Sequence, residues 1–131
     1  MPSNQPSDLP SLSPSTVLTS SYEYVGEGDC FDSFGSYYFK VIFNDVVTAN
    51  ACAVKCNDCV AGNVSGGSLR GFELGSSDQL CYCLMDSNAS YTGSCAVSQV
   101  FEHWYLCGVG PVDGSDMSDP ASKCYKIKAQ G

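Results

Sequence analysis

Nine cysteines are the feature that most constrains how this chain of 131 residues can fold. Such a content is typical of secreted domains, in which disulfides stabilise a small core. Cys52 and Cys56 are four residues apart, so on a helix they share one face about 6 Å apart along the axis. Cys81 and Cys83 are two residues apart, so on a strand they share one face about 6.6 Å apart. The matching spacings predict that two parallel disulfides join a helix to a strand.

A metal site is the alternative interpretation of these cysteines. Cys56 and Cys59 form a C-x-x-C pair, and Cys81 and Cys83 could complete four thiolates of the kind that binds zinc. We favour disulfides, and predict neither a metal nor another cofactor, because secreted cysteine-rich chains are usually oxidised.

The sequence does not determine how the other cysteines pair. Nine is an odd number, so one cysteine is expected to be free or bonded to another chain. We expect Cys30 to connect the start of the domain to its end, at Cys107 or Cys124. The next candidates for pairing are Cys59 and Cys95.

The first 20 residues differ from the rest. Proline recurs every four residues from Pro2 to Pro14, and a serine follows each proline. Proline excludes both a helix and a central strand, and few apolar residues are available for burial. We therefore predict an extended polyproline-type tail over residues 1–20, resting on a neighbouring subunit or covered by glycans. The predicted O-glycosylation sites, which would spiral around such a helix, are Ser3, Ser7, Ser11, Ser15 and Thr16.

Residues 21–131 are predicted to form one disulfide-rich α+β domain, with one helix packed on a short-stranded antiparallel sheet. Residues 44–58 are the helix, and Thr48 is its expected N-cap. The apolar and β-branched segments that predict strands are residues 36–43, 69–74, 80–85, 100–106 and 123–128.

The charge of the chain excludes several classes of partner. A net charge of −8 argues against nucleic acid and against an anionic membrane surface. No apolar run is long enough for membrane insertion. Two sequons, at Asn63 and Asn88, predict N-glycosylation and agree with a secreted or cell-surface location. No signal peptide is visible after Met1, so we expect a piece of a longer secreted chain.

The sequence contains no motif that indicates catalysis, and we predict a protein that is not an enzyme. Its one histidine, His103, has no nucleophile motif beside it. Glu27, Asp29 and Asp32 could act as the paired carboxylates of a glycosidase, but a solvated acidic turn is the simpler interpretation.

Three further groups of residues could contact a ligand. Trp104 and Tyr105 could stack on sugar rings, although aromatic residues also fill half-buried strands. Arg70 could hold a carboxylate of a partner, or form an internal ion pair. The acidic loop with Asp113, Asp116 and Asp119 could bind calcium, but its spacing is not that of an EF-hand.

Three segments carry a resemblance to known families: "YEYVGEGDCFDSFGSYY", "ACAVKC" and "RGFELGSSDQLCYC". Together they resemble the PAN/apple-like fold over about residues 22–127, in which a helix with a C-x-x-x-C pair is tied to an antiparallel sheet. The third segment also resembles the WSC domain, a relative thought to bind glycans. The tail is similar to Pro-Ser stalks of diatom secreted proteins. With the spacing, the resemblance implies the pairs Cys52–Cys83 and Cys56–Cys81.

The expected function is that of a non-enzymatic extracellular module. It would mediate protein–protein or protein–glycan contacts in a cell-surface or matrix glycoprotein, as a structural subunit of a glycosylated assembly or filament. Its partners would be other extracellular chains, copies of itself among them, or glycans. The alternatives are a WSC-like glycan-binding lectin and, less favoured, a secreted hydrolase.

Overall fold

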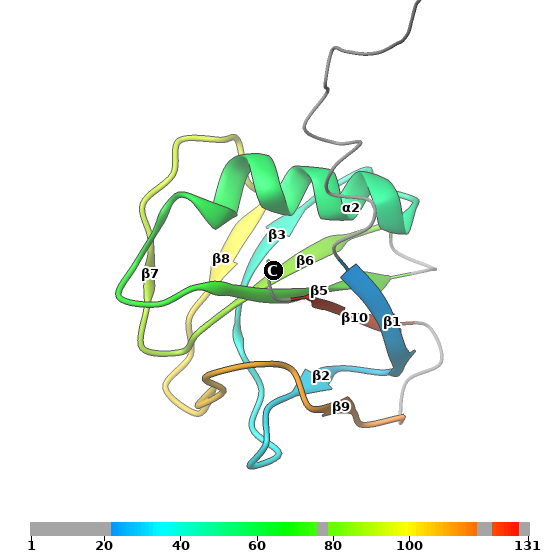
Figure 1. Ribbon diagram of the computed structural model, residues 1–131. Helices are drawn as coiled ribbons and strands as arrows, with labels where there is room; N and C mark the ends of the chain where they lie inside the picture. Colours follow the sequence, from blue (N-terminus) through cyan, green and yellow to red (C-terminus); the bar gives the residue numbers. More distant parts are fainter. Residues whose placement is uncertain (1–21, 76–78, 118–121, 129–131) are drawn as a thin grey trace, which may run out of the picture.

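The computed structural model describes residues 22–75, 79–117 and 122–128, which form a small, mostly antiparallel sheet with one short α-helix (Figure 1). The predicted tail lies outside the described residues. The O-glycosylation sites predicted there are Ser3, Ser7, Ser11, Ser15 and Thr16. Among the described residues, no helix is both long and apolar enough to cross a membrane.

The main sheet has six strands in the order β1-β10-β5-β6-β3-β8, and each neighbouring pair is antiparallel. Two smaller antiparallel pairs, β2 with β9 and β4 with β7, lie outside it. The strands are β1 (Tyr22–Glu27), β2 (Cys30–Phe31), β3 (Phe39–Phe43), β4 (Val64–Ser65), β5 (Leu69–Gly75), β6 (Cys81–Met85), β7 (Ser90–Tyr91), β8 (Gln99–Phe101), β9 (Gly114–Ser115) and β10 (Ser122–Ile127).

The helix is shorter than the predicted segment 44–58. It forms α2 (Ala49–Cys56) and continues as one π-helical turn, η1 (Asn57–Ala61). Thr48 is the N-cap, as expected, and its side-chain oxygen accepts a hydrogen bond from the Ala51 amide at 3.1 Å. The helix therefore begins after Thr48, and the preceding residues form the turn from β3.

Four of the predicted strand segments contain a strand, namely β3, β5, β6 and β10. The fifth, residues 100–106, is a strand only as far as Phe101. Beyond it, the Leu106 amide donates to the His103 carbonyl at 3.0 Å, which closes a turn. Residues 102–105 are exposed and do not continue the strand.

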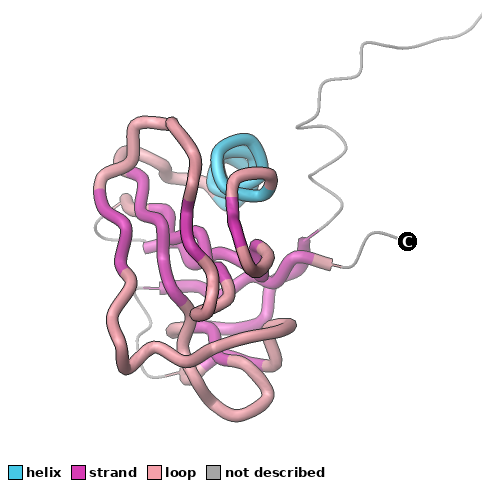
Figure 2. The backbone as a smooth tube through the Cα atoms, turned by 90° about the vertical axis from the view of Figure 1, so that its left-hand side faces the viewer, coloured by secondary structure: helices cyan, strands magenta, loops and turns pink. Residues whose placement is uncertain are grey.

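The helix and the β2–β9 pair cover opposite faces of the main sheet. In Figure 1, α2 lies above the strands, and β2 and β9 lie below them; Figure 2 shows the helix nearly end-on beside the sheet. Side chains alternate along each strand, so Cys83 of β6 packs toward the helix and Leu84 packs in the second cluster with Cys30. The domain thus has two small hydrophobic clusters, one on each face.

Two disulfides join α2 to β6, but their predicted order was wrong. Cys52 pairs with Cys81 and Cys56 with Cys83, each with a Cα–Cα distance of 5.5 Å. Helix α2 follows β3 through a short reversing turn, so it runs opposite to β3. Because β6 is also antiparallel to β3, helix and strand run in the same direction, and the first cysteine of one meets the first of the other.

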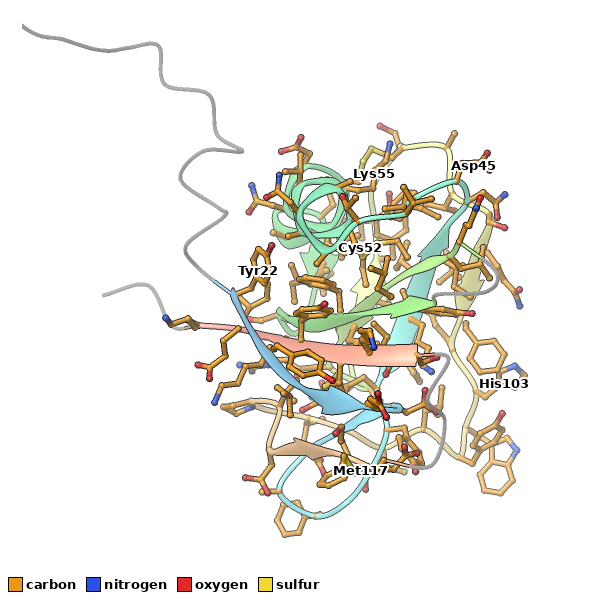
Figure 3. All side chains as sticks on the ribbon, turned by 90° about the vertical axis from the view of Figure 1, so that its right-hand side faces the viewer. Tyr22, Asp45, Cys52, Lys55, His103 and Met117 are labelled. Atoms are coloured by element: carbon orange, nitrogen blue, oxygen red, sulfur yellow. A yellow bond between two sulfur atoms is a disulfide. The ribbon has the colours of Figure 1, made fainter. Side chains whose placement is uncertain are left out.

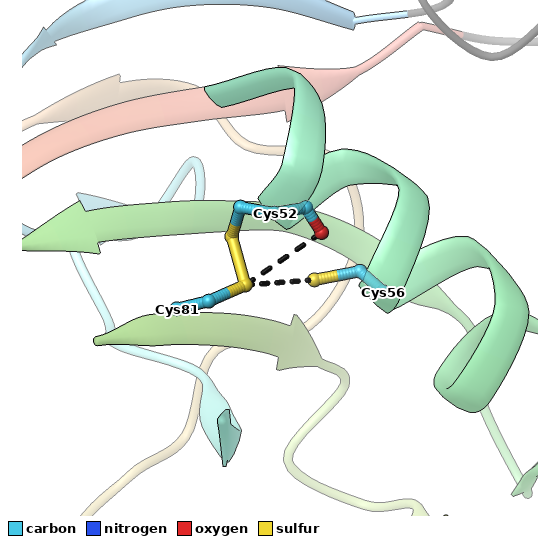
Figure 4. A group of neighbouring side chains, drawn as sticks. All are labelled: Cys52, Cys56 and Cys81. Atoms are coloured by element: carbon cyan, nitrogen blue, oxygen red, sulfur yellow. Dashed lines mark hydrogen bonds between the residues drawn. A yellow bond between two sulfur atoms is a disulfide. The ribbon is translucent and has the colours of Figure 1, made fainter. Parts of the chain in front are cut away.

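The sulfur atoms of this ladder lie close together. Cys56 Sγ is 3.7 Å from Cys81 Sγ, and the two belong to different disulfides (Figure 4). These sulfurs are bonded in pairs, so they do not present the thiolates that a zinc site needs. The alternative site also required Cys59, which instead pairs with Cys95.

The remaining pairing uses one of the two partners expected for Cys30. Cys30 is bonded to Cys124, which fastens β2 to β10 across 94 residues of sequence. Cys107 is free and exposed, and is thus the odd cysteine in the structure.

Removing one bridge of the ladder should weaken the fold. We expect Cys56→Ala with Cys83→Ala to lower the free energy of unfolding by about 2–4 kcal/mol, because the unfolded chain gains freedom. Cys107→Ser is the control and should change it by less than about 0.5 kcal/mol, since that side chain is exposed. Chemical denaturation monitored by circular dichroism measures both, and equal midpoints would contradict the expectation.

Candidate functional site

The most exposed aromatic surface is the last residue of β8 and the turn that follows it, residues 101–105, which we call the aromatic loop. Strand β8 is an edge strand, so the loop leaves the sheet at its border. The side chain of Trp104 is 90% exposed and that of Tyr105 is 55% exposed. Figure 3 shows His103 at the side of the molecule, away from the helix. The ligand-contact residues predicted here are therefore available to a partner.

The rings of the aromatic loop form a continuous series. The Phe101 and His103 rings lie 4.0 Å apart, His103 and Tyr105 stack at 5.3 Å, and Trp104 meets Tyr105 edge-on at 6.0 Å. Flat ring faces with polar atoms at their edges suit stacking on sugars or on apolar side chains. Buried Leu106 anchors the end of the loop.

Arg70, the third predicted contact residue, does not join this surface. Its guanidinium donates to both carboxylate oxygens of Asp86, at 2.9 and 3.1 Å. Asp86 also accepts from the Ser68 and Gly110 amides, at 2.9 and 2.8 Å. Burial raises the pKa of Asp86, but these hydrogen bonds outweigh it and hold the pKa below its usual value. Arg70 thus forms an internal ion pair with Asp86, and this pair fixes the loop at Gly110.

The three carboxylates of the hydrolase hypothesis each have a structural partner. Asp32 is buried and accepts from the Phe34, Ser36 and Val109 amides at 2.9–3.0 Å. Burial raises the pKa of Asp32, but the hydrogen bonds from those amides outweigh it, so the pKa lies below its usual value. A carboxylate held in this way is not poised to donate a proton.

The other two carboxylates form ion pairs. Glu27 lies 3.9 Å from Lys123 Nζ, and Asp29 lies 3.9 Å from Lys40 Nζ. The structure therefore does not bring the predicted trio together around one cleft.

The acidic loop proposed for calcium is occupied by internal contacts. Asp116 accepts from the Tyr37 hydroxyl at 3.0 Å and from the Asp29 amide at 3.1 Å. Asp113 is exposed in a different part of the loop, and Asp119 lies outside the described residues.

A buried ion pair was missed by the sequence analysis. Glu73, only 2% exposed, accepts from Lys40 Nζ at 3.2 Å and from the Cys30 amide at 2.9 Å. Burial raises the pKa of Glu73 to about 7, although Lys40 partly opposes this. The available signal was a lone acid between Phe72 and Leu74 in an apolar strand, which places it on the opposite face from both.

The two sequons lie side by side. Strands β4 and β7 pair Ser65 with Ser90, the third residues of the two sequons. Asn88 is exposed, whereas Asn63 is half-buried and its Nδ2 donates to the Cys59 carbonyl at 3.0 Å. The attachment atom of Asn63 is therefore already engaged.

Comparisons of this chain with protein-family models, with curated proteins and with solved structures found no match.

N-glycosylation should differ between the two sequons. We expect high occupancy at Asn88 and lower occupancy at Asn63, because only the first has an exposed and unengaged Nδ2. Glycopeptide mass spectrometry of chain secreted from a eukaryotic host measures both sites. Asn88→Gln should remove most of the N-glycan and Asn63→Gln little; the reverse would contradict the expectation.

Stability should fall as pH rises from about 4.5 to about 7. In this window, unfolded Glu73 has lost its proton while folded Glu73 retains it, so higher pH favours the unfolded chain. Glu73→Gln cannot ionise and should remove this part of the slope. Denaturant unfolding at a series of pH values measures it, and parallel profiles for both proteins would disprove the assignment to Glu73.

Proposed function

We propose that this chain is a non-enzymatic, PAN/apple-like extracellular module that contacts other protein chains, copies of itself among them, or their glycans, as a structural subunit of a glycosylated surface or matrix assembly. Four disulfides are consistent with an extracellular protein. The proposed contact surface is the aromatic loop.

The exposure of Trp104 is the observation that carries this proposal. Tryptophan is usually well buried, and here 90% of it faces solvent at a sheet edge. Aromatic residues, tryptophan above all, dominate the energetics of contact surfaces. The loop is held on a rigid sheet by buried Leu106 and by the Gly108 amide, which donates to the Tyr37 carbonyl at 2.7 Å. An aromatic surface that is both exposed and anchored suits recognition.

Cys107 supports association between chains. It is exposed, free and two residues beyond Tyr105, so chains that meet at the aromatic loop bring two thiols together. An intermolecular disulfide there would make the contact permanent in an oxidising compartment. The Pro-Ser tail, if glycosylated as predicted, would act as a spacer in the same assembly.

A lectin is the second candidate, and the row of rings at the aromatic loop favours it. Aromatic faces stack on sugar rings, and Glu102 between Phe101 and His103 is an exposed carboxylate that could accept from sugar hydroxyls. A lectin of this kind would bind a glycan while remaining a monomer.

Truncating the two exposed aromatic side chains of the aromatic loop should weaken binding. We expect Trp104→Ala with Tyr105→Ala to weaken self-association or glycan binding by about tenfold or more, the usual effect of removing central aromatic residues. The matched control is Phe34→Ala, another aromatic side chain, 85% exposed, on a different loop. It should leave binding unchanged.

Two measurements separate the candidates. Light scattering after size exclusion reports self-association, and a glycan array reports sugar binding; Cys107→Ser is included in both to separate covalent from non-covalent contact. Concentration-dependent oligomers that the double variant lacks support the structural module, and saturable binding by a monomer supports the lectin. Unchanged behaviour of the double variant in both assays would refute the proposed surface.

A further inference from the structure

One lysine and two acidic side chains meet beneath the β2–β9 pair, on the sheet face away from the helix. Lys40 of β3 places its Nζ 3.2 Å from Glu73 Oε1 and 3.9 Å from Asp29 Oδ1. The exposed fractions of the side chains are 15% for Lys40, 2% for Glu73 and 39% for Asp29. An amine, a carboxyl group and a second, buried carboxyl group are thus within reach of one another.

Neighbouring groups hold these side chains in place. The Cys30 amide donates to Glu73 Oε2 at 2.9 Å, which leaves Oε1 for Lys40. The backbone amide of Asp29 donates to Asp116 Oδ1 at 3.1 Å, which fixes the residue next to Cys30. The Lys40 amine also lies 5.4 Å from the centre of the Tyr82 ring, which shields it from solvent on that side. The cluster is therefore arranged before any reaction.

The protonation of the cluster suits proton transfer. Burial alone would lower the pKa of Lys40, but the charges of Glu73 and Asp29 raise it, so the amine carries a proton at rest. Burial raises the pKa of Glu73 to about 7, so near neutral pH this carboxyl group can both accept and release a proton. Glu73 is also in hydrogen-bond contact with the amine from which that proton would come.

We propose that Lys40 and Asp29 condense to form an intramolecular amide cross-link, with Glu73 as the proton relay. This inference concerns a covalent modification of the chain itself and does not depend on the proposed binding function. Holding two groups at near-contact distance in one folded chain replaces a bimolecular encounter, which is the main entropic barrier to such a reaction.

The step balances without another reactant. Glu73 accepts one proton from the Lys40 ammonium, and the free amine attacks Cγ of Asp29. Glu73 returns that proton to an oxygen of the tetrahedral intermediate, and then passes on a second proton from the Lys40 nitrogen. The C–O bond breaks, and water leaves with both protons. Ammonium and carboxylate thus become one amide and one water, and the amide keeps the third proton.

The cross-link would reinforce the sheet face that the two-residue strands β2 and β9 cover. It would join β3 to the residue that precedes β2, a connection of 11 residues, beside the Cys30–Cys124 disulfide. Unlike that disulfide, an amide persists under reducing conditions.

Intact-mass spectrometry of the full-length oxidised chain, incubated at neutral pH, tests the proposal. The expected mass is lower by one water than that of the sequence with its four disulfides. After reduction and digestion, trypsin should fail to cleave after Lys40, so residues 1–55 should appear as one peptide that is lighter by one water and whose fragmentation is suppressed between Asp29 and Lys40. Glu73→Gln should keep the full mass while retaining the disulfide pairing.

Two further variants complete the test. Asp29→Ala should fold, because it removes only a partly exposed side chain, and it should show no water loss. It therefore tests the cross-link even if Glu73→Gln does not fold. Asp113→Ala removes the Asp-Gly dipeptide at which a succinimide could also lose water, and should still show the loss. A wild-type chain at full mass overturns the proposal, as does a water loss that maps to Asp113. Water loss that persists in folded Glu73→Gln overturns the relay.

Discussion

Two disulfides attach helix α2 to the central strand β6, and the other layers of the domain depend on that attachment. A domain of about 110 residues, whose described part has one short α-helix, buries little apolar surface, so covalent links substitute for part of the core. The bridges from Cys52 and Cys56 enter the middle of the main hydrophobic cluster and fix the helix over one face of the sheet. The opposite face must then be covered by something other than a helix.

The cover on that opposite face is short, and it brings charges into the interior. Strands β2 and β9 have two residues each, and the Cys30–Cys124 bridge pins them to the sheet. Strand β5 shows the contrast: Phe72 packs under the helix, while Glu73 points the other way toward Cys30 and Lys40. The pH dependence of stability and the proposed cross-link both arise from this one buried carboxyl group.

The aromatic loop has a different relation to the fold. It contributes little to the core, since Trp104 and Tyr105 face solvent, yet its ends are tied to the sheet by Phe101 and Leu106. A rigid base with an exposed aromatic loop at a free sheet edge is the arrangement expected of a recognition surface. The edge strand β8 is short, which limits uncontrolled strand pairing between copies.

The sequence by itself indicated the helix, four strands of the main sheet and the presence of the ladder, but not β1, which forms one edge of that sheet. The spacing of Cys52 with Cys56 and of Cys81 with Cys83 indicated a helix joined to a strand, because each spacing follows from local geometry. Thr48 marked the start of the helix for the same local reason. Tertiary structure decided the order of pairing, since the relative direction of α2 and β6 depends on the turn after β3. It also decided that Glu73 is buried beside Lys40, because β5 and β3 are brought together only through β6, an arrangement that no local pattern encodes.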